Sequence, residues 1–444
     1  MKFLIDLAYL LALIVISPVA IYRMLRYGRY RAGWGNRFGR ISRKYPNKKC
    51  IWTHAVSVGE VNATTTLIKE LEKILPDYEI VISTTTDTGF ARANELFGNR
   101  LSVFYFPLDF SWTMRRAIAS IRPTICLLME LEVWPNLVRI ARQSGIPVVV
   151  VNGRLSERSF AKYKLIKAVT RKVFGNLTLA LVQSEEYAER FRRLGVPAEK
   201  TIVTGSVKYD TAQVADKVDG ADILAEHLFG KIENRKSKIE NPLWVAGATG
   251  DGEEQIILDV YRRLIEQKQF QNLRLAIVPR KPERFEEVAD LIKQAGFGLI
   301  RYSELKKGPE AKSKINYQSS IINVILGDTM GDLRKFYSLA TVIFVGRSLV
   351  PMGGSDMMEA AALGKCTIFG PYAFNFKQAV EDLLKANGAI LVKNANELFN
   401  TMTKCLTDTN YAYRIAHNGQ EIIRKNQGAT ARTIAQITKL IREY

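Results

Sequence analysis

The chain has 444 residues, 47% of them hydrophobic, and this length accommodates about two or three domains with apolar cores. Its formal net charge of +20 favours an anionic partner: nucleic acid, anionic lipid or a phosphorylated substrate. The four cysteines lie far apart without a CxxC pair, and only three histidines occur. This composition disfavours a disulfide framework, a zinc cluster and a histidine-based metal centre, so we expect no metal site.

The N-terminus begins with an apolar run, FLIDLAYLLALIVISPVAIY, at residues 3–22. A helix of about 20 residues just spans a bilayer core. Residues 23–49 then carry ten Arg and Lys side chains, and no acid occurs between Leu7 and Gly59. Such a basic cluster stays cytoplasmic and attracts anionic lipid. We predict an uncleaved membrane anchor at residues 1–25 with the protein body in the cytoplasm; a cleaved signal peptide is the alternative.

Nucleic acid is the less favoured partner for this basic run. The run adjoins the apolar segment, and no zinc-finger, helix-turn-helix or RNP pattern surrounds it.

Strands and helices are predicted to alternate after the anchor, in a first domain at residues 26–210. β-branched runs predict strands at 50–56, 79–85, 101–107, 124–130, 147–153, 179–184 and 201–205. Helical spacing predicts helices at 60–75, 87–97, 111–120, 134–143, 156–174 and 185–194. This alternation indicates an α/β fold with a parallel, doubly wound sheet.

A second alternating set follows a charged segment, residues 211–241, which we interpret as a linker. Strands are predicted at 242–250, 273–280, 297–303, 321–328, 340–346, 366–371 and 388–393. We therefore predict a second Rossmann-like domain at 242–420. A basic C-terminal helix at 421–444 could pack back on the first domain.

The stretch HAVSVGEVNA places Glu60 where the first strand turns into a helix. An acid there can cap the helix, or it can face a ligand at the carboxyl end of the strand. Other polar side chains follow later strands of the first domain: Glu130, Glu132 and Lys208. Glu132 could also cap the helix that starts near Trp134. Acids and bases that cluster at one sheet edge indicate a reactive site.

The second half supplies glycine-rich turns after its strands, such as GATGDGEE (247–254) and GDTMGDL (327–333). Glycines let backbone N–H groups approach a phosphate, and Arg280 at a strand end suits a phosphate. No turn reads GxGxxG or GxxxxGK[ST], so neither a dinucleotide nor a P-loop is indicated. Glu359 could reach a ribose hydroxyl pair or be an ordinary surface glutamate. Together the two halves suit group transfer from a nucleotide-activated donor.

Seven motifs resemble those of the Kdo transferases of lipopolysaccharide assembly, which transfer 3-deoxy-D-manno-octulosonic acid (Kdo) from CMP-Kdo to a lipid A precursor. They are HAVSVGEV, MELEVWPN, NGRLSERS, GSVKYD, PRKPERF, GDTMGDL and FGPYAFNF. The resemblance implies a GT-B architecture of two Rossmann-like domains. It also implies an inverting transfer to the glucosamine disaccharide of lipid IVA, with release of CMP.

The resemblance also implies roles for individual residues. Glu60 matches the catalytic base, and Glu130 and Lys208 match residues that stabilise the transition state. The matching CMP contacts are Pro279, Arg280, Met330, Gly331, Asp332, Asp356, Met357, Met358 and Glu359. No metal or other cofactor is expected, because a CMP-sugar carries one phosphate and no pyrophosphate. The expected partners are the CMP-sugar, the anionic lipid A precursor and the inner (cytoplasmic) membrane, with no nucleic acid.

The donor half departs from the family pattern. Residues 353–361 read GGSDMMEAA where the family has GGHNPLEPA, and three family histidines are replaced by Gly250, Lys281 and Tyr372. A GT-B transferase of another CMP- or UDP-linked sugar, a nucleotide-sugar epimerase and a non-catalytic membrane-tethered nucleotide-binding protein are the alternatives.

Overall fold

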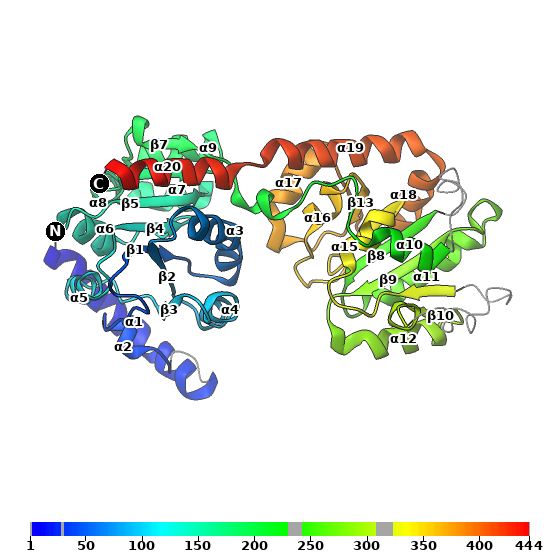
Figure 1. The fold of residues 1–444 in the computed structure, drawn as a ribbon, viewed down its shortest axis with the longest axis horizontal. Coiled ribbons are helices and arrows are strands. Elements are labelled where there is room, and N and C mark those ends of the chain that lie inside the picture. The colour runs from blue at the N-terminus through cyan, green and yellow to red at the C-terminus, as the bar shows by residue number, and fades with distance from the viewer. Residues whose placement is uncertain (1, 28–30, 230–241, 308–322, 444) are drawn as a thin grey trace. The chain divides into compact units, whose positions relative to one another are not determined.

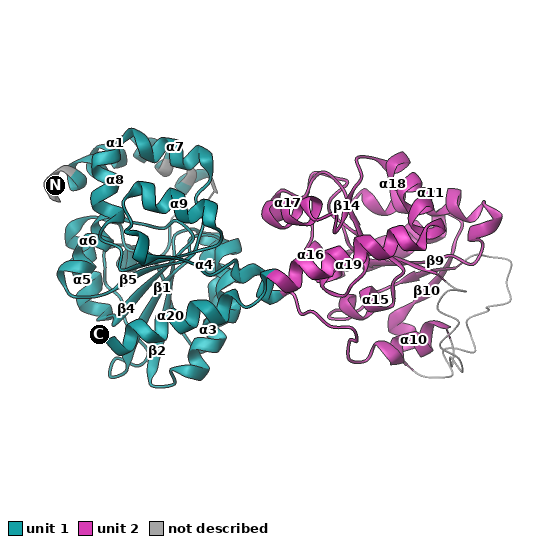
Figure 2. Cartoon of the chain, turned by 90° about the horizontal axis from the view of Figure 1, so that it is seen from above, with its two compact units in different colours: residues 1–211, 426–444 teal, residues 212–425 magenta. Residues whose placement is uncertain are grey.

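The computed structural model describes residues 2–27, 31–229, 242–307 and 323–443 (Figure 1). The chain forms two compact units (Figure 2). Unit 1 comprises Met1–Thr211 and Asn426–Tyr444, and unit 2 comprises Ala212–Lys425. Both are α/β units built on a seven-stranded sheet, and every strand pair in the described ranges is parallel. The predicted fold class is confirmed for both units.

The sheet of unit 1 has the order β3-β2-β1-β4-β5-β6-β7. Its strands are β1 Lys49–His54, β2 Tyr78–Thr84, β3 Ser102–Tyr105, β4 Ile125–Met129, β5 Val148–Gly153, β6 Leu179–Val182 and β7 Thr201–Val203. Its helices are α1 Lys2–Tyr27, α2 Trp34–Arg37, α3 Val58–Ile74, α4 Asp87–Phe97, α5 Ser111–Ile121, α6 Pro135–Gln143, α7 Glu157–Leu165, α8 Lys167–Phe174, α9 Glu185–Leu194 and α20 Ala429–Glu443, with 3-10 turns η1 Ala198–Lys200 and η2 Val207–Thr211. The strand order reverses between β1 and β4, and open α/β sheets bind ligands at such a point.

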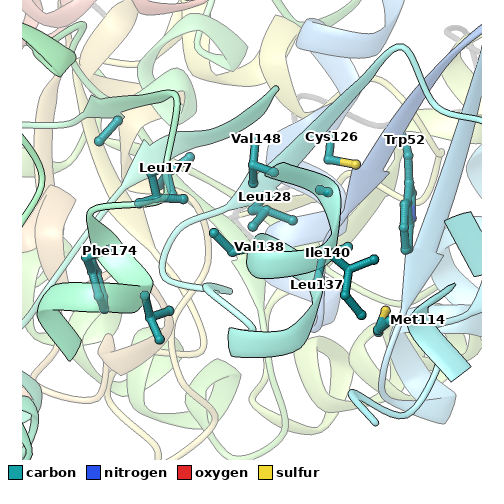
Figure 3. Packing of buried hydrophobic residues seen from close by; sticks show 14 of the residues in the cluster. Trp52, Met114, Cys126, Leu128, Leu137, Val138, Ile140, Val148, Phe174 and Leu177 are labelled. Atoms are coloured by element: carbon teal, nitrogen blue, oxygen red, sulfur yellow. The ribbon is translucent and has the colours of Figure 1, made fainter. Parts of the chain in front are cut away.

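Both faces of this sheet are covered, which explains why its strands read as continuous apolar runs. Successive residues of β1 point to opposite faces: Trp52 joins the core under α5, α6, α8 and α9, and Ile51 joins the core under α3 and α4. Figure 3 shows Trp52 in the first of these cores together with Met114, Cys126 and Leu128. The C-terminal helix α20 completes the second core with Ile434 and Ile437.

The sheet of unit 2 has the order β10-β11-β9-β8-β12-β13-β14. Its strands are β8 Leu243–Thr249, β9 Arg274–Pro279, β10 Gly298–Arg301, β11 Asn323–Leu326, β12 Val342–Val345, β13 Cys366–Phe369 and β14 Ile390–Leu391. Its helices are α10 Ala221–Phe229, α11 Glu253–Ile265, α12 Phe285–Gln294, α13 Tyr302–Leu305, α15 Leu333–Leu339, α16 Met357–Ala362, α17 Lys377–Lys385, α18 Ala395–Thr407 and α19 Thr409–Asn426, with 3-10 turns η4 Lys268–Phe270, η5 Pro282–Arg284 and η6 Phe374–Phe376. Here the strand order reverses between β8 and β12.

The segment predicted as a linker contributes to unit 2. Its helix α10 packs on α15 and buries Leu224 and Leu228. Residues 230–241, the most charged part of that prediction, lie outside the described residues.

The N-terminal helix α1 is bonded to unit 1 by polar side chains. The Asp6 carboxylate accepts hydrogen bonds from the Ser111 backbone N–H at 2.9 Å and from the Asn136 side-chain amide at 3.0 Å. The Tyr9 hydroxyl donates to Asp109 at 2.9 Å. A search of the helices in the described ranges found none with the length and hydropathy needed to cross a membrane.

A buried ion pair fixes the segment that precedes β1. The Arg43 guanidinium lies 2.8 Å from the Glu79 carboxylate, and both side chains are almost fully buried. Glu79 also accepts from the Lys44 backbone N–H at 2.9 Å, and Arg43 donates to the Ile121 carbonyl at 3.0 Å.

We expect Glu79→Ala to lower the free energy of unfolding by about 3–5 kcal/mol, because it leaves the Arg43 charge buried without a partner. Urea unfolding measures the loss. The matched control is Glu72→Ala, which removes the partner of the half-exposed Arg100 and should cost about 1 kcal/mol or less. Equal losses for the two variants would contradict the prediction.

Candidate active site

Glu60 is fixed at the start of α3 by a capping box, because the sequence places Ser57 three residues before it. Ser57 is the N-cap, and its hydroxyl accepts from the Glu60 backbone N–H. The Glu60 carboxylate accepts in return from the Ser57 hydroxyl and from the Val56 backbone N–H, both at 2.9 Å. The capping role is therefore confirmed, and the same contacts fix the position of this half-buried carboxylate.

The surroundings of Glu60 favour its protonated form. Burial raises the pKa of Glu60, and the negative charge of Glu130 acts in the same direction. The hydrogen bonds from Val56 and Ser57 and the positive charge of Lys208 oppose this rise in pKa. Since Glu130 and Lys208 both act on Glu60, the structure brings the three sequence-predicted residues of unit 1 together.

Glu130 and Lys208 form an ion pair, with the ammonium nitrogen 3.4 Å from the carboxylate oxygen. Glu130 follows β4 with a φ of 53°, a left-handed conformation that a non-glycine residue adopts at a cost. The buried Asn152, the penultimate residue of β5, is also left-handed, and its side-chain oxygen accepts from the Val207 backbone N–H at 3.2 Å. Asn152 thereby holds η2, which carries Lys208, against the sheet edge. No local pattern predicts this contact, because it joins residues 55 positions apart.

Glu132 belongs to the same acidic cluster, although the resemblance gave it no role. It does not cap α6, whose N-cap is Trp134; it accepts instead from the indole N–H of Trp134 at 3.0 Å. The capping interpretation is wrong because Asp109 occupies that place, accepting from the backbone N–H groups of Asn136 and Leu137. Burial, reinforced by the charge of Glu60, raises the pKa of Glu132 to about 7.

His54 lies behind Glu132 as a neutral ring. It is fully buried and stacks on Phe106 with 3.9 Å between ring centroids, and burial lowers its pKa to about 3. Its Nδ1 lies 3.1 Å from the Ser83 carbonyl oxygen and 3.0 Å from the Ser83 hydroxyl. Its Nε2 lies 4.0 Å from a carboxylate oxygen of Glu132.

In unit 2, one buried glutamate joins the loops that follow β8 and β12. The Glu253 carboxylate accepts from the backbone N–H groups of Gly250 at 3.1 Å, Ser348 at 2.7 Å and Leu349 at 2.8 Å, and also from that of Arg347. These two loops flank the point where the strand order reverses. No sequence motif singled out Glu253, because three of its four backbone partners lie more than 90 residues away along the chain.

The same edge is tightly packed. A side chain at Gly370 would place its Cβ 2.2 Å from the Ser348 carbonyl oxygen, so the loop after β13 requires glycine there. The Ser348 hydroxyl accepts from the Gly370 backbone N–H at 2.8 Å. The three loops after β8, β12 and β13 therefore form one fixed surface.

The residues predicted to contact CMP lie in three groups in unit 2. Pro279 ends β9, and the backbone N–H of Arg280 donates to the Thr249 carbonyl at 3.1 Å. Asp356 is the N-cap of α16 and accepts from the backbone N–H of Met358, the residue after Met357. Burial and the charge of Asp356 raise the pKa of Glu359, while Arg334 and Arg280 lower it.

Met330, Gly331 and Asp332 form the third group, in the turn before α15. Met330 is largely exposed, and Gly331 has a φ of 84°. Asp332 is held by Lys306 at 2.7 Å and Lys335 at 2.8 Å. Burial acts to raise the pKa of Asp332, but these lysines lower it to about 2. Asp332 therefore remains charged and shapes the turn.

A search of the described ranges found no group of three or more His, Cys, Asp or Glu side chains arranged to hold a metal ion. Three kinds of group in the described ranges could take part in chemistry. The Glu60 carboxylate can transfer a proton, Lys208 and Arg280 can pair with an anion, and the loops of unit 2 contain backbone N–H donors.

Comparison with known proteins identifies relatives that cover nearly all of the chain. The family model of 3-deoxy-D-manno-octulosonic-acid transferase (kdotransferase) matches residues 32–211. The 3-deoxy-D-manno-octulosonic acid transferase of Haemophilus influenzae is 34% identical over 414 residues, which cover 91% of this chain and 91% of that protein. The transferase of the same name from Bordetella pertussis is 30% identical over 440 residues, covering 96% and 97%.

Among solved structures, a glycosyltransferase from Rickettsia africae matches with a TM-score of 0.52 at 15% identity, over 89% of this chain and 99% of that one. This likeness concerns the fold alone and agrees with a GT-B arrangement of two parallel-sheet α/β domains. The resemblance found in the motifs is confirmed by the identity along the whole chain: this protein belongs to the 3-deoxy-D-manno-octulosonic acid transferases, a family of glycosyltransferases.

Proposed function

We propose that this Kdo transferase uses CMP-Kdo as its donor and the glucosamine disaccharide of lipid IVA as its acceptor, and inverts the anomeric centre. The observation that carries the proposal is the Glu60 carboxylate, fixed by its capping box at a ligand-binding sheet edge, with its pKa raised by burial. A general base works best when its pKa approaches the working pH.

The reaction is a single displacement. A glucosamine hydroxyl oxygen attacks the anomeric carbon of Kdo, and Glu60 takes the hydroxyl proton. The bond between that carbon and the phosphate oxygen breaks, and CMP leaves with the electron pair. In this proposal Lys208, whose ammonium lies 3.4 Å from the Glu130 carboxylate, supplies the positive charge that stabilises the negative charge developing on the leaving phosphate.

The donor would be held by unit 2. The loops fixed by Glu253 and Gly370 would form the wall of the phosphate site, and Arg280 would supply a forked donor for the single phosphate. Three family histidines are replaced in this unit, by Gly250, Lys281 and the partly exposed Tyr372. Another CMP-linked sugar is therefore the second candidate donor.

The acceptor is an anionic lipid, and we propose that α1 attaches the protein to the inner membrane with its catalytic units in the cytoplasm. Val15 and Leu25 of α1 are more than 70% exposed, although both are large apolar residues. Among the basic residues that follow, Arg26, Arg31 and Arg40 are exposed and suit anionic headgroups. Asp6 is engaged with unit 1, so the one acid of the apolar run does not face lipid.

The first test is Glu60→Gln. Glutamine keeps a hydrogen-bond acceptor for the capping box but cannot take a proton, so we expect transfer to fall by about 10²–10⁴-fold with the melting temperature unchanged. The assay is transfer of labelled Kdo from CMP-Kdo to lipid IVA in the presence of EDTA. The control is Glu70→Gln on the same helix, whose carboxylate pairs with Lys73 and should not affect transfer.

The outcomes of this assay separate the parts of the proposal. Full activity of Glu60→Gln would contradict its role as the base. An unmodified protein that binds CMP tightly but transfers no Kdo would indicate another sugar.

A second prediction concerns pH. The negative charges of Glu60 and Glu132 repel each other, which contributes to the raised pKa of Glu132. Glu132→Gln removes this repulsion, so Glu60 should lose its proton more readily. We expect the acidic limb of the kcat/KM profile to move to lower pH in this variant. An unmoved limb would show that Glu132 does not act on the base.

The same variant should change stability with a defined sign. The pKa of Glu132 is about 7 in the folded protein and about 4.5 when unfolded, so folding favours its protonated form. Its ionisation therefore destabilises the folded protein progressively from about pH 4.5 to about pH 7. We expect Glu132→Gln to be the more stable protein above pH 7, with no such difference near pH 4, when urea unfolding is measured at both pH values.

A further inference from the structure

The junction of α7 and α8 exposes a short apolar surface on unit 1, which we call the α7–α8 tip (residues 164–169). Leu165 is 85% exposed, more than any other large apolar residue in the described ranges. Ile166 and Val169 are exposed beside it, at 55% and 42%. The sequence predicted one continuous helix over 156–174, but the structure breaks it at Ile166. Neighbouring apolar side chains left in water mark an interaction surface.

The α7–α8 tip is a folded feature with defined hydrogen bonds. The backbone N–H groups of Val169 and Thr170 donate to the Ile166 carbonyl at 2.9 and 3.0 Å. On its inner side, Tyr163 packs edge-on against the buried Phe174, and Phe160 is also buried. These aromatic side chains hold the segment to the core while its other apolar side chains point outward.

The segment around the tip is strongly positive. Residues 154–172 contain seven basic side chains and one acid, and the acid, Glu157, is paired with Arg190 at 2.9 Å. The basic side chains are Arg154, Arg158, Lys162, Lys164, Lys167, Arg171 and Lys172. Apolar side chains surrounded by Lys and Arg are the pattern of a segment that lies in the interface of an anionic bilayer.

The tip also lies on the same side of the sheet as α1. Helices α1 and α8 both pack on α6, and Figure 2 shows α1, α7 and α8 on one side of unit 1. The exposed apolar side chains of α1 and of the tip therefore belong to neighbouring elements.

We propose that the α7–α8 tip is a second membrane contact of this protein. Leu165, Ile166 and Val169 enter the boundary between headgroups and acyl chains, and the surrounding Lys and Arg side chains bind lipid phosphates. The occupant is an anionic bilayer, because the charge complements it and α1 brings the same side of unit 1 towards lipid. With a contact besides α1, unit 1 cannot rotate freely about a single attachment. This inference does not depend on which sugar is transferred.

The test is a fluorescent probe at position 165 of the full chain. All four native cysteines are buried, so Leu165→Cys introduces an accessible thiol that the environment-sensitive dye NBD labels selectively. Vesicles of phosphatidylglycerol and phosphatidylethanolamine are added, and sedimentation verifies that the protein binds. We expect a blue shift and a gain of NBD emission, and quenching by lipids that carry a spin label in the acyl chain.

The matched control is Ile74→Cys, labelled in the same way. Ile74 is an apolar residue at a helix end of unit 1 and is 52% exposed, but α3 covers the opposite face of the sheet and Glu70 and Glu72 lie nearby. Its label should stay in water. Adding Lys164→Gln and Lys167→Gln to the 165-labelled protein should weaken tip insertion about fivefold for each lysine removed.

Two results would overturn the proposal. A label at 165 that stays in water on sedimented protein would refute the second contact and leave α1 as the attachment. Failure of the protein to sediment with vesicles would refute both contacts. Kdo transfer is assayed separately. A labelled protein that still transfers Kdo has an intact reaction, whichever result the probe at 165 gives.

Discussion

In a parallel sheet every strand ends at the same edge, and this constraint determines where the reactive groups of both units lie. It brings Glu60 after β1, Glu130 after β4 and Lys208 after β7 to one edge of unit 1, although they are distant in sequence. In unit 2 it brings the loops after β8, β12 and β13 together, and Glu253 then joins the first two by accepting four backbone N–H groups. A carboxylate fixed by backbone donors thus organises each edge.

The capping role and the proposed catalytic role of Glu60 are compatible, although the sequence presented them as alternatives. Its hydrogen bonds with Val56 and Ser57 cap α3, and those same bonds fix the carboxylate that we propose as the base. They also lower its pKa, so burial and neighbouring acids must supply the opposite effect. The left-handed backbone at Glu130 and Asn152 is the conformational cost of placing a second acid and a lysine near the first.

The sequence predicted the strands and the residues at their ends well, because buried parallel strands read as apolar runs and motifs are local. It could not predict the contacts that join distant segments. The bond from Asn152 to Val207 and the position of His54 behind Glu132 depend on which strands are neighbours. Glu253 reads as an ordinary acid in the first turn of a helix, and only the fold reveals that its partners follow β12. The break at Ile166 was hidden because the apolar spacing continues through it.

The C-terminal helix has a consequence for how the protein is made. Ile434 and Ile437 of α20 fill the core under α3 and α4, so one face of the first sheet is incomplete until α20 has left the ribosome. Most chains complete their N-terminal domain during synthesis. Here we expect unit 2 to complete its own core first. Part of the apolar surface of unit 1 then remains exposed to solvent until α20 packs on it. Chaperone demand and sensitivity to C-terminal truncation should therefore concentrate in the half that carries Glu60.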